Sequence, residues 1–249
     1  MHRLVLTLSL KEIRQRRLES ASGFMHYFMP GAGTLFFVIA LARMNHFSAS
    51  GIPYPAYLLS GFVPWVFFQS GVSTATRSFV TESHLVRQSN FPRLVIPLAA
   101  VLSAFLLTLP QFAFVPVVLL LCGIKPALSW ILYLPLLFGV QIALATGIGL
   151  CAAVANVYWR EVSTLISGLL RIGFLACPVL YPLHKHGPSS GVYWFNPMSG
   201  IVDGYHRAFL ENRPPDLMRF GYAAAIAVFF CAAGYLIFRR LEKNLGDPL

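Results

Sequence analysis

Long stretches without a charged side chain alternate along this chain with short charged connections. The uncharged stretches cover residues 20–42, 44–76, 94–124, 126–159 and 220–238. Each is close to or above the roughly 20 apolar residues that a helix needs to cross a bilayer. The hydrophobic pattern therefore predicts an all-α integral membrane protein.

Six spans are predicted, because the stretch after Arg160 is also apolar apart from one arginine. We expect the spans at residues 24–42, 54–76, 94–122, 128–154, 162–182 and 220–238, within one membrane domain of residues 1–249. Residues 1–22 place Leu6 and Leu10 on one side of a helix and Arg14 elsewhere. This arrangement predicts an amphipathic helix that lies in the membrane interface.

The segment between the fifth and sixth spans is too apolar for a simple solvated loop. It contains the aromatic residues Tyr193, Trp194 and Tyr205, and such side chains favour the headgroup depth of a bilayer. We expect short helices over residues 192–212 that dip into the outer interface. An aromatic anchor with no other role is the alternative.

The amino-acid composition indicates that lipid, not water, is the main solvent. Of the 249 residues, 57% are apolar and only 11% are charged, whereas roughly a quarter of the residues of a soluble domain are charged. Too few polar side chains remain to cover a soluble globule, and the apolar content excludes a disordered chain.

The charged residues predict an orientation. The chain has 19 Lys and Arg against 9 Asp and Glu, for a net charge of +10, but the apolar stretches leave no continuous basic stripe for a nucleic acid. Twelve of the basic residues fall in residues 1–23, 77–93, 159–161 and 239–249, and six fall in the opposite connections. By the positive-inside rule, both termini are expected in the cytoplasm.

Signatures of enzymes and cofactor sites are missing from the sequence. It has no GxxxxGK[ST] phosphate loop and no HExxH or GxSxG motif, and its four cysteines are far apart. His184 and His186 flank Lys185 without an acidic or thiol neighbour that could complete a metal site. No catalytic or metal-binding residue is predicted, and any energy source must come from another protein.

Arg171 is the one charged residue inside a predicted span. A central arginine costs roughly 2.5–3.5 kcal/mol on the insertion scale, so Arg171 caps backbone carbonyls, reaches toward a membrane face or lines a wet path for an anion. Aromatic residues gather at the second span, and their faces suit the CH-rich faces of a sliding sugar polymer; lipid-facing aromatic residues are the alternative. The candidate substrate-path residues are Arg171, Tyr57, Trp65 and Phe68.

Five segments follow one another in an order and spacing typical of one transporter family. They are Tyr57–Phe68 (YLLSGFVPWVFF), His84–Pro97 (HLVRQSNFPRLVIP), Asn156–Val162 (NVYWREV), Cys177–Pro182 (CPVLYP) and Trp194–Met198 (WFNPM). Together they resemble the membrane permease of ATP-binding-cassette polysaccharide exporters, which handle O-antigen, capsule or teichoic acid. The resemblance covers nearly the whole chain.

This resemblance implies a subunit of the bacterial inner membrane that forms a homodimer around a channel. Each homodimer would bind two copies of a cytoplasmic ATPase, which would hold ATP and Mg, while this chain would bind no cofactor. Its substrate would be a lipid-linked glycan that crosses the membrane outward.

The same resemblance assigns candidate residues to the two ends of the subunit. Residues 83–93 would form a coupling helix that contacts the ATPase, through His84, Leu85, Val86, Arg87, Phe91, Pro92 and Arg93. The outer gate would contain Tyr193, Trp194, Asn196, Pro197 and Tyr205.

Two other functions stay open at this point. An exporter of drugs or small lipids would have a similar six-span permease, and the dependence of surface glycan on the gene product would distinguish it. A membrane glycan acyltransferase is a function of a different class. It would need a convergent acid, base or nucleophile, which the scattered histidines and carboxylates do not provide.

Overall fold

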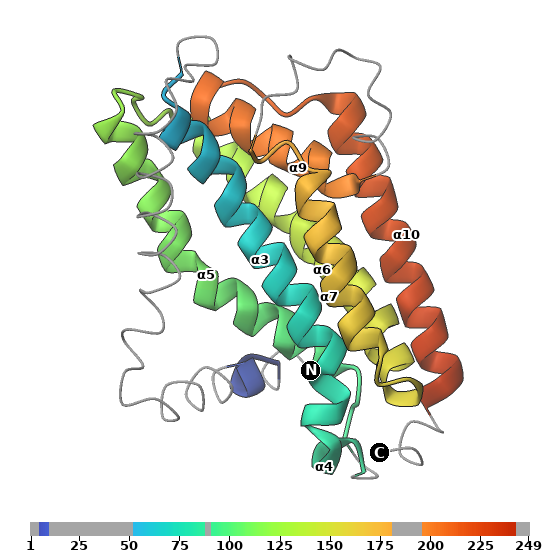
Figure 1. Cartoon of the computed structure of the whole chain (residues 1–249). Helices are drawn as coiled ribbons and strands as arrows, with labels where there is room; N and C mark the ends of the chain where they lie inside the picture. The colour runs from blue at the N-terminus through green and yellow to red at the C-terminus, as the bar shows by residue number, and fades with distance from the viewer. Residues whose placement is uncertain (1–4, 10–51, 88–90, 181–195, 243–249) are drawn as a thin grey trace.

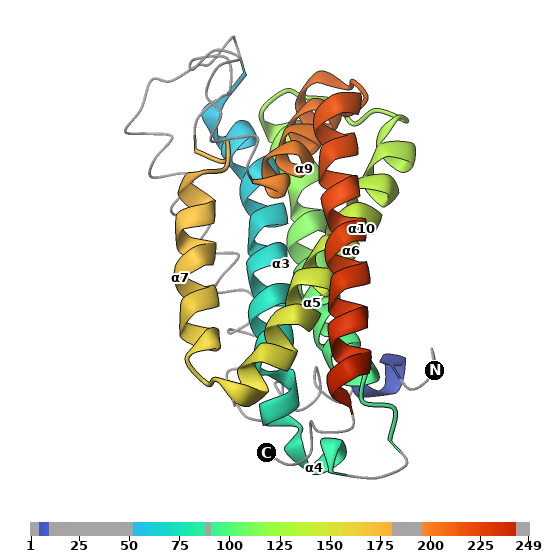
Figure 2. The same cartoon turned by 90° about the vertical axis from the view of Figure 1, so that its right-hand side faces the viewer.

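The structure is a computed structural model that describes residues 5–9, 52–87, 91–180 and 196–242. All of its named elements are helices. Four long helices lie side by side in a bundle, and α7 packs against two of them, α3 and α6 (Figures 1 and 2). These five helices are α3 (Tyr54–Thr81), α5 (Val95–Leu121), α6 (Trp130–Tyr158), α7 (Val162–Leu175) and α10 (Leu217–Leu241).

Short helices mark the two ends of the bundle. The α4 end, at the bottom of Figure 1, holds α4 (Ser83–Val86), the α6–α7 turn, the end of α10 and the helical residues 5–9. The α9 end, at the top, holds α9 (Pro197–His206), the π-helix η2 (Arg207–Glu211) and the start of α10. Successive long helices run in opposite directions between these ends (Figure 2).

Three of the described helices are long and apolar enough to cross a membrane, namely α5, α6 and α10. This finding confirms a helical membrane protein. α3 is as long, but it carries more polar residues and buries 17 of its 28 residues inside the bundle. α7 is a shorter apolar helix of 14 residues that ends at Leu175. The predicted first span, residues 24–42, lies outside the described residues, so the count of six stays a prediction.

The outer surface of the bundle is apolar. On α10 only Ala223, Ala227, Gly234 and Phe238 are buried, while large apolar side chains such as Val228 are exposed. Exposed large apolar residues also line α7 and the adjoining ends of α5 and α6. A soluble protein rarely exposes so much contiguous apolar surface, whereas lipid tails cover it without cost.

Close contact between α6 and α10 fixes one side of the bundle. A Cβ atom added to Gly147 would lie 2.5 Å from the backbone nitrogen of Cys231, and one added to Gly234 would lie 3.0 Å from the carbonyl oxygen of Gly147. Small residues allow such backbone approach between membrane helices, where dispersion contacts drive association. The Cys231 thiol also donates a hydrogen bond to the Ala143 carbonyl at 3.1 Å.

We expect Gly147→Ala to destabilise the protein, because the new methyl group would collide with the backbone of α10. Overpacking of this kind typically costs about 1–3 kcal/mol, which for a chain of this size lowers the unfolding temperature by roughly 2–12 °C. The measurement is the thermal unfolding midpoint of the detergent-solubilised protein.

Gly139→Ala on the same helix is the matched control, since nothing lies within 4 Å of its added Cβ atom. This variant should melt at the wild-type temperature or slightly above it, because alanine favours a helix. Equal midpoints for both variants would contradict the close α6–α10 contact.

Candidate functional site

The α9–η2 segment enters the α9 end of the bundle and is held by polar side chains. Asn196 caps α9, because its Oδ1 accepts a hydrogen bond from the Met198 amide at 3.0 Å. The Nδ2 of the same side chain donates to the Gly173 carbonyl of α7 at 3.0 Å. Pro197 occupies the first turn, where its missing amide proton costs nothing. Asn196 therefore starts α9 and joins it to α7.

A buried hydrogen-bond chain connects α9 with two long helices. The Tyr205 hydroxyl donates to Oε1 of Gln141 on α6 at 2.8 Å, and Nε2 of Gln141 donates to the Pro64 carbonyl of α3 at 2.6 Å. Tyr205 and Gln141 are both fully buried. Each of these two hydrogen bonds joins side chain or backbone groups of different helices. Together they fix the position of α9 between α3 and α6.

His206 makes a second buried connection to α3. Its ring stacks on the ring of Tyr57 at a centroid distance of 4.1 Å, and its Nε2 lies 3.1 Å from the Tyr57 carbonyl oxygen. Burial lowers the pKa of His206 to about 3, against the opposing effect of that hydrogen bond. The imidazole is thus neutral, and its proton must sit on Nε2, because the carbonyl can only accept.

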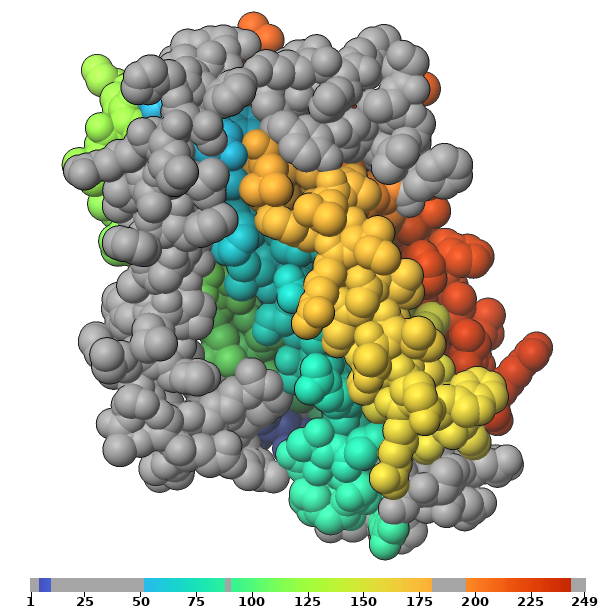
Figure 3. Space-filling model, viewed as in Figure 1, coloured from blue at the N-terminus to red at the C-terminus, as the bar shows by residue number. Residues whose placement is uncertain are grey.

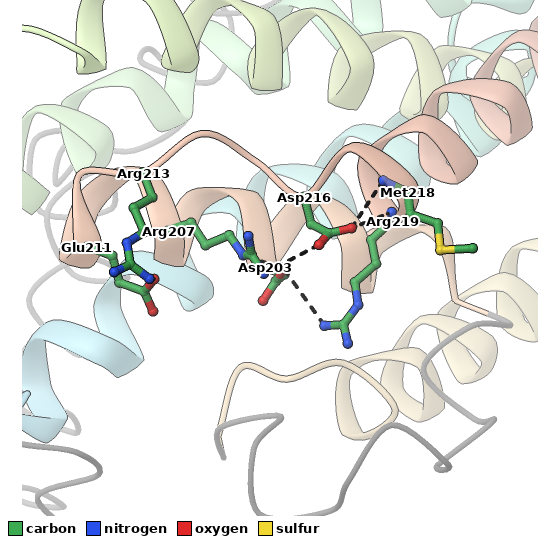
Figure 4. Close-up of polar contacts among 7 residues, drawn as sticks. All are labelled: Asp203, Arg207, Glu211, Arg213, Asp216, Met218 and Arg219. Carbon is green, nitrogen blue, oxygen red and sulfur yellow. Dashed lines mark hydrogen bonds and ion pairs between the residues drawn. The ribbon is translucent and has the colours of Figure 1, made fainter.

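Charged side chains form a network where α9–η2 meets α10 (Figure 4). Oδ2 of Asp203 lies 3.2 Å from Nε of Arg207 and 3.8 Å from Nη1 of Arg219. Asp216 caps α10 by accepting hydrogen bonds from the amides of Met218 and Arg219, and its Oδ2 lies 3.5 Å from Nη2 of Arg207. The network therefore joins a residue of α9 to the first turn of α10.

The pKa values of the two carboxylates in this network shift in opposite directions. Burial raises the pKa of Asp203, although Arg207 and Arg219 oppose the shift. The hydrogen bond from the Arg219 amide lowers the pKa of Asp216, which is more exposed. A third pair, Arg213 with Glu211 at 3.7 Å, lies on the exposed side of η2 and does not reach α10.

The α4 end is built around a small second core. Val86 of α4 is fully buried in a cluster with residues of α3, α5, α6 and α10, and Phe91 packs against this cluster. Nε of Arg93 donates to the Val86 carbonyl at 2.9 Å, and its Nη1 donates to the Glu242 carbonyl just after α10. The segment after α4 is thereby attached to the end of α10.

The predicted coupling residues divide into two groups. His84 on α4 and Arg87, which follows the last residue of α4, are exposed, and Nε2 of His84 lies 3.5 Å from a carboxylate oxygen of Glu82. The others hold α4 and the following turn in place or are partly buried there: Leu85, Val86, Phe91, Pro92 and Arg93. Only the first group projects from the α4 end.

The predicted path residues are separated. Tyr57, Trp65 and Phe68 are buried inside the subunit, with at most 8% of each exposed. Arg171 is exposed on the outward surface of α7, the helix at the front of Figure 3. Trp65 lies behind α7, with its ring 5.7 Å from that of Phe174.

The predicted gate residues are also divided. Asn196, Pro197 and Tyr205 all lie on or cap α9, whereas Tyr193 and Trp194 lie outside the described residues. Sequence reasoning missed Gln141, His206 and Asp203. A lone amide inside an apolar stretch was the available signal for Gln141, but its partner is 64 positions away in the sequence.

No group of three His, Cys, Asp or Glu residues within the described part of the chain could hold a metal ion. The α4 end instead presents the exposed side chains of His84 and Arg87. At the α9 end, hydrogen bonds hold α9 between the long helices.

The sequence profile of the ABC-2 type transporter family matches residues 3–210. The chain belongs to this family. Its resemblance to exporter permeases is therefore confirmed, and the ABC-2 assignment makes it a membrane component of an ABC transporter.

Curated relatives of this ABC-2 protein are similar over most of their length. The O-antigen export system permease protein RfbA of Myxococcus xanthus is 26% identical over 253 residues, covering 99% of this chain and 95% of that protein. RfbA of Klebsiella pneumoniae is 24% identical over 203 residues, covering 79% of this chain and 76% of that protein. The polysialic acid transport protein KpsM of Escherichia coli is 22% identical over 247 residues, with coverages of 97% and 94%.

We expect Tyr205→Phe to lower stability, because it leaves the buried Oε1 of Gln141 without its donor. An unsatisfied buried acceptor costs about 1–3 kcal/mol. The thermal unfolding midpoint in detergent again measures the effect. Tyr235→Phe changes a tyrosine of α10 that is 43% exposed and should leave the midpoint within error. An equal loss for both variants would argue against the buried hydrogen-bond chain.

Proposed function

We propose that this chain is the permease subunit of an ABC exporter that moves a lipid-linked, O-antigen-like polysaccharide outward across the bacterial inner membrane. Support comes from relatives named as polysaccharide export or transport proteins, which match almost the full chain. Two copies of the chain form the channel as a homodimer. A separate cytoplasmic ATPase, also in two copies, binds ATP and Mg and supplies the energy.

The α4 end is the cytoplasmic side in this proposal, and both termini lie there. It collects residues 5–9, the basic segment around α4 and Arg239 and Arg240 at the end of α10. An excess of basic residues on one side is typical of the cytoplasmic face. The first span and α7 complete the six crossings.

His84 of α4 and Arg87, the residue after this helix, dock the ATPase. They flank Val86, the buried residue that anchors α4 in the second core. A docking helix fixed in this way passes the movement of a partner to the bundle, because packed cores shift as units and do not deform continuously.

The glycan passes along the outward surface of α7, with Arg171 attracting anionic groups of the substrate. The buried side chains of Tyr57, Trp65 and Phe68 do not contact the glycan. They pack beneath α7 and the α9 end and support both. The outer gate is α9–η2 together with residues 192–195.

The function is tested in a strain that lacks the gene. This strain should lose its surface polysaccharide and accumulate lipid-linked glycan inside, and the wild-type gene should restore export. Unchanged surface polysaccharide together with loss of resistance to a drug would favour the drug exporter.

Arg87→Glu should abolish this restoration, since a reversed charge at the docking surface weakens ATPase binding by about ten-fold for each 1.4 kcal/mol lost. Copurification of the ATPase measures binding, and membrane levels of the permease are compared in parallel. Arg213→Glu makes the same charge change at the other end of the bundle and should retain both binding and export.

Arg171→Gln should still insert and assemble but export an anionic glycan several-fold more slowly. Losing about 1 kcal/mol of attraction corresponds to roughly a five-fold change. Arg171→Lys keeps the charge and should remain near the wild-type rate. Equal export by both variants would remove Arg171 from the substrate path.

A further inference from the structure

α10 is attached at the α4 end to the segment that follows α4. The Arg93 guanidinium donates hydrogen bonds to the carbonyls of Val86, in α4, and of Glu242, just after α10. The rings of Phe79 on α3 and Phe238 on α10 stack with centroids 6.1 Å apart. The segment around α4 and the end of α10 are therefore attached to each other.

Along its length, α10 is held in register by α6. The backbones approach so closely at Gly147 that a Cβ atom there would collide with the backbone of α10. α10 exposes most of its other faces and buries only four residues. α10 is one continuous helix of 25 residues, so it connects the two ends of the bundle as a single rigid rod.

At the α9 end, the rod meets α9 in a second close contact. A Cβ atom added to Gly200 would lie 2.5 Å from the carbonyl oxygen of Arg219. Three residues further along α9, Asp203 pairs with Arg219 of α10 and with Arg207 of its own segment. Arg207 in turn reaches Asp216, the cap of α10 (Figure 4).

From these three attachments, and resting on the proposed function, we infer that Asp203 is a positioning residue that couples α9–η2 to α10. In this inference, α10 carries movement from the ATPase-facing α4 end of the bundle to the α9 end. The Asp203 side chain acts through Arg219 and touches no substrate.

A role in stability alone explains this carboxylate poorly. The Asp203 side chain is only 15% exposed, whereas those of Arg207 and Arg219 are about one-third exposed. Burying an ion pair costs desolvation that often cancels its attraction, and the best-attested use of such pairs is to fix the register of elements. The pairing of Asp203 with Arg219 fixes the position of α9 relative to α10 in this way.

The test uses the permease with its ATPase in lipid nanodiscs and a reporter cysteine, Pro214→Cys, in a background without the native cysteines. Pro214 is exposed in the connection between η2 and α10. We compare the rate of maleimide modification without nucleotide and after trapping with ATP and vanadate. In the otherwise wild-type complex, trapping should change this rate at least three-fold.

Asp203→Asn should bring the ratio of the two rates close to one, while ATP hydrolysis and the unfolding midpoint stay near wild-type values. Glu211→Gln removes a carboxylate from the same segment without touching α10 and should keep the full change. A merely structural role would instead lower the unfolding midpoint and ATP hydrolysis together.

Should Asp203→Asn fail to fold, Arg219→Gln replaces it with the same expectations, because it leaves Asp203 paired with Arg207. A full nucleotide-dependent change in either folded variant overturns the inference. A wild-type complex that hydrolyses ATP without any change at the reporter also overturns it and leaves the proposed function intact. A permease that binds no ATPase overturns the proposed function itself.

Discussion

The structure depends on one constraint, that backbone polar groups in a lipid environment must find their partners within the protein. Long helices satisfy most of them. Inside α3, the carbonyl of Pro64 accepts a hydrogen bond from the Gln141 side chain of α6. Where α9 and α10 begin, the side chains of Asn196 and Asp216 accept from the first free amides. The polar residues of this apolar chain are thus concentrated at places where helices cross or begin.

The polar groups around the α9–η2 segment are neutral where they are deeply buried and charged where they are partly exposed. The deepest contacts of the α9–η2 segment use neutral groups, in Tyr205, Gln141 and His206, because an unpaired charge there would be expensive. The ionised network of Asp203 and its arginines lies where α9 meets the first turn of α10, and these arginines keep partial access to solvent. The neutral contacts seat the segment against α3 and α6, and the charged ones tie it to α10.

The two ends of the bundle differ in how they are exposed. At the α4 end, a small core holds Val86 and leaves His84 and Arg87 on the surface, which suits contact with a protein partner. At the α9 end, most of the α9 helix is buried within the bundle. α10 touches both ends and packs closely along α6 between them, so one continuous helix connects the two ends.

The sequence alone determined that α5, α6 and α10 are apolar helices. An uncharged stretch of that length in a membrane satisfies its backbone hydrogen bonds by forming a helix. The sequence also assigned the family through five ordered motifs, which the family profile confirms. It did not predict the partners of Gln141 and Asp203, which lie on helices that meet only after folding.

The tertiary structure decided which side of each helix faces protein and which faces lipid. Both environments are apolar, so the hydrophobic pattern does not distinguish the heavily buried α3 from the largely exposed α10. For the same reason the aromatic residues Trp65 and Phe68 could have faced a path or lipid, and only the crossing of α3 with its neighbours placed them in the core. Close helix crossings, set by small residues such as Gly147 and by buried polar pairs, made that choice.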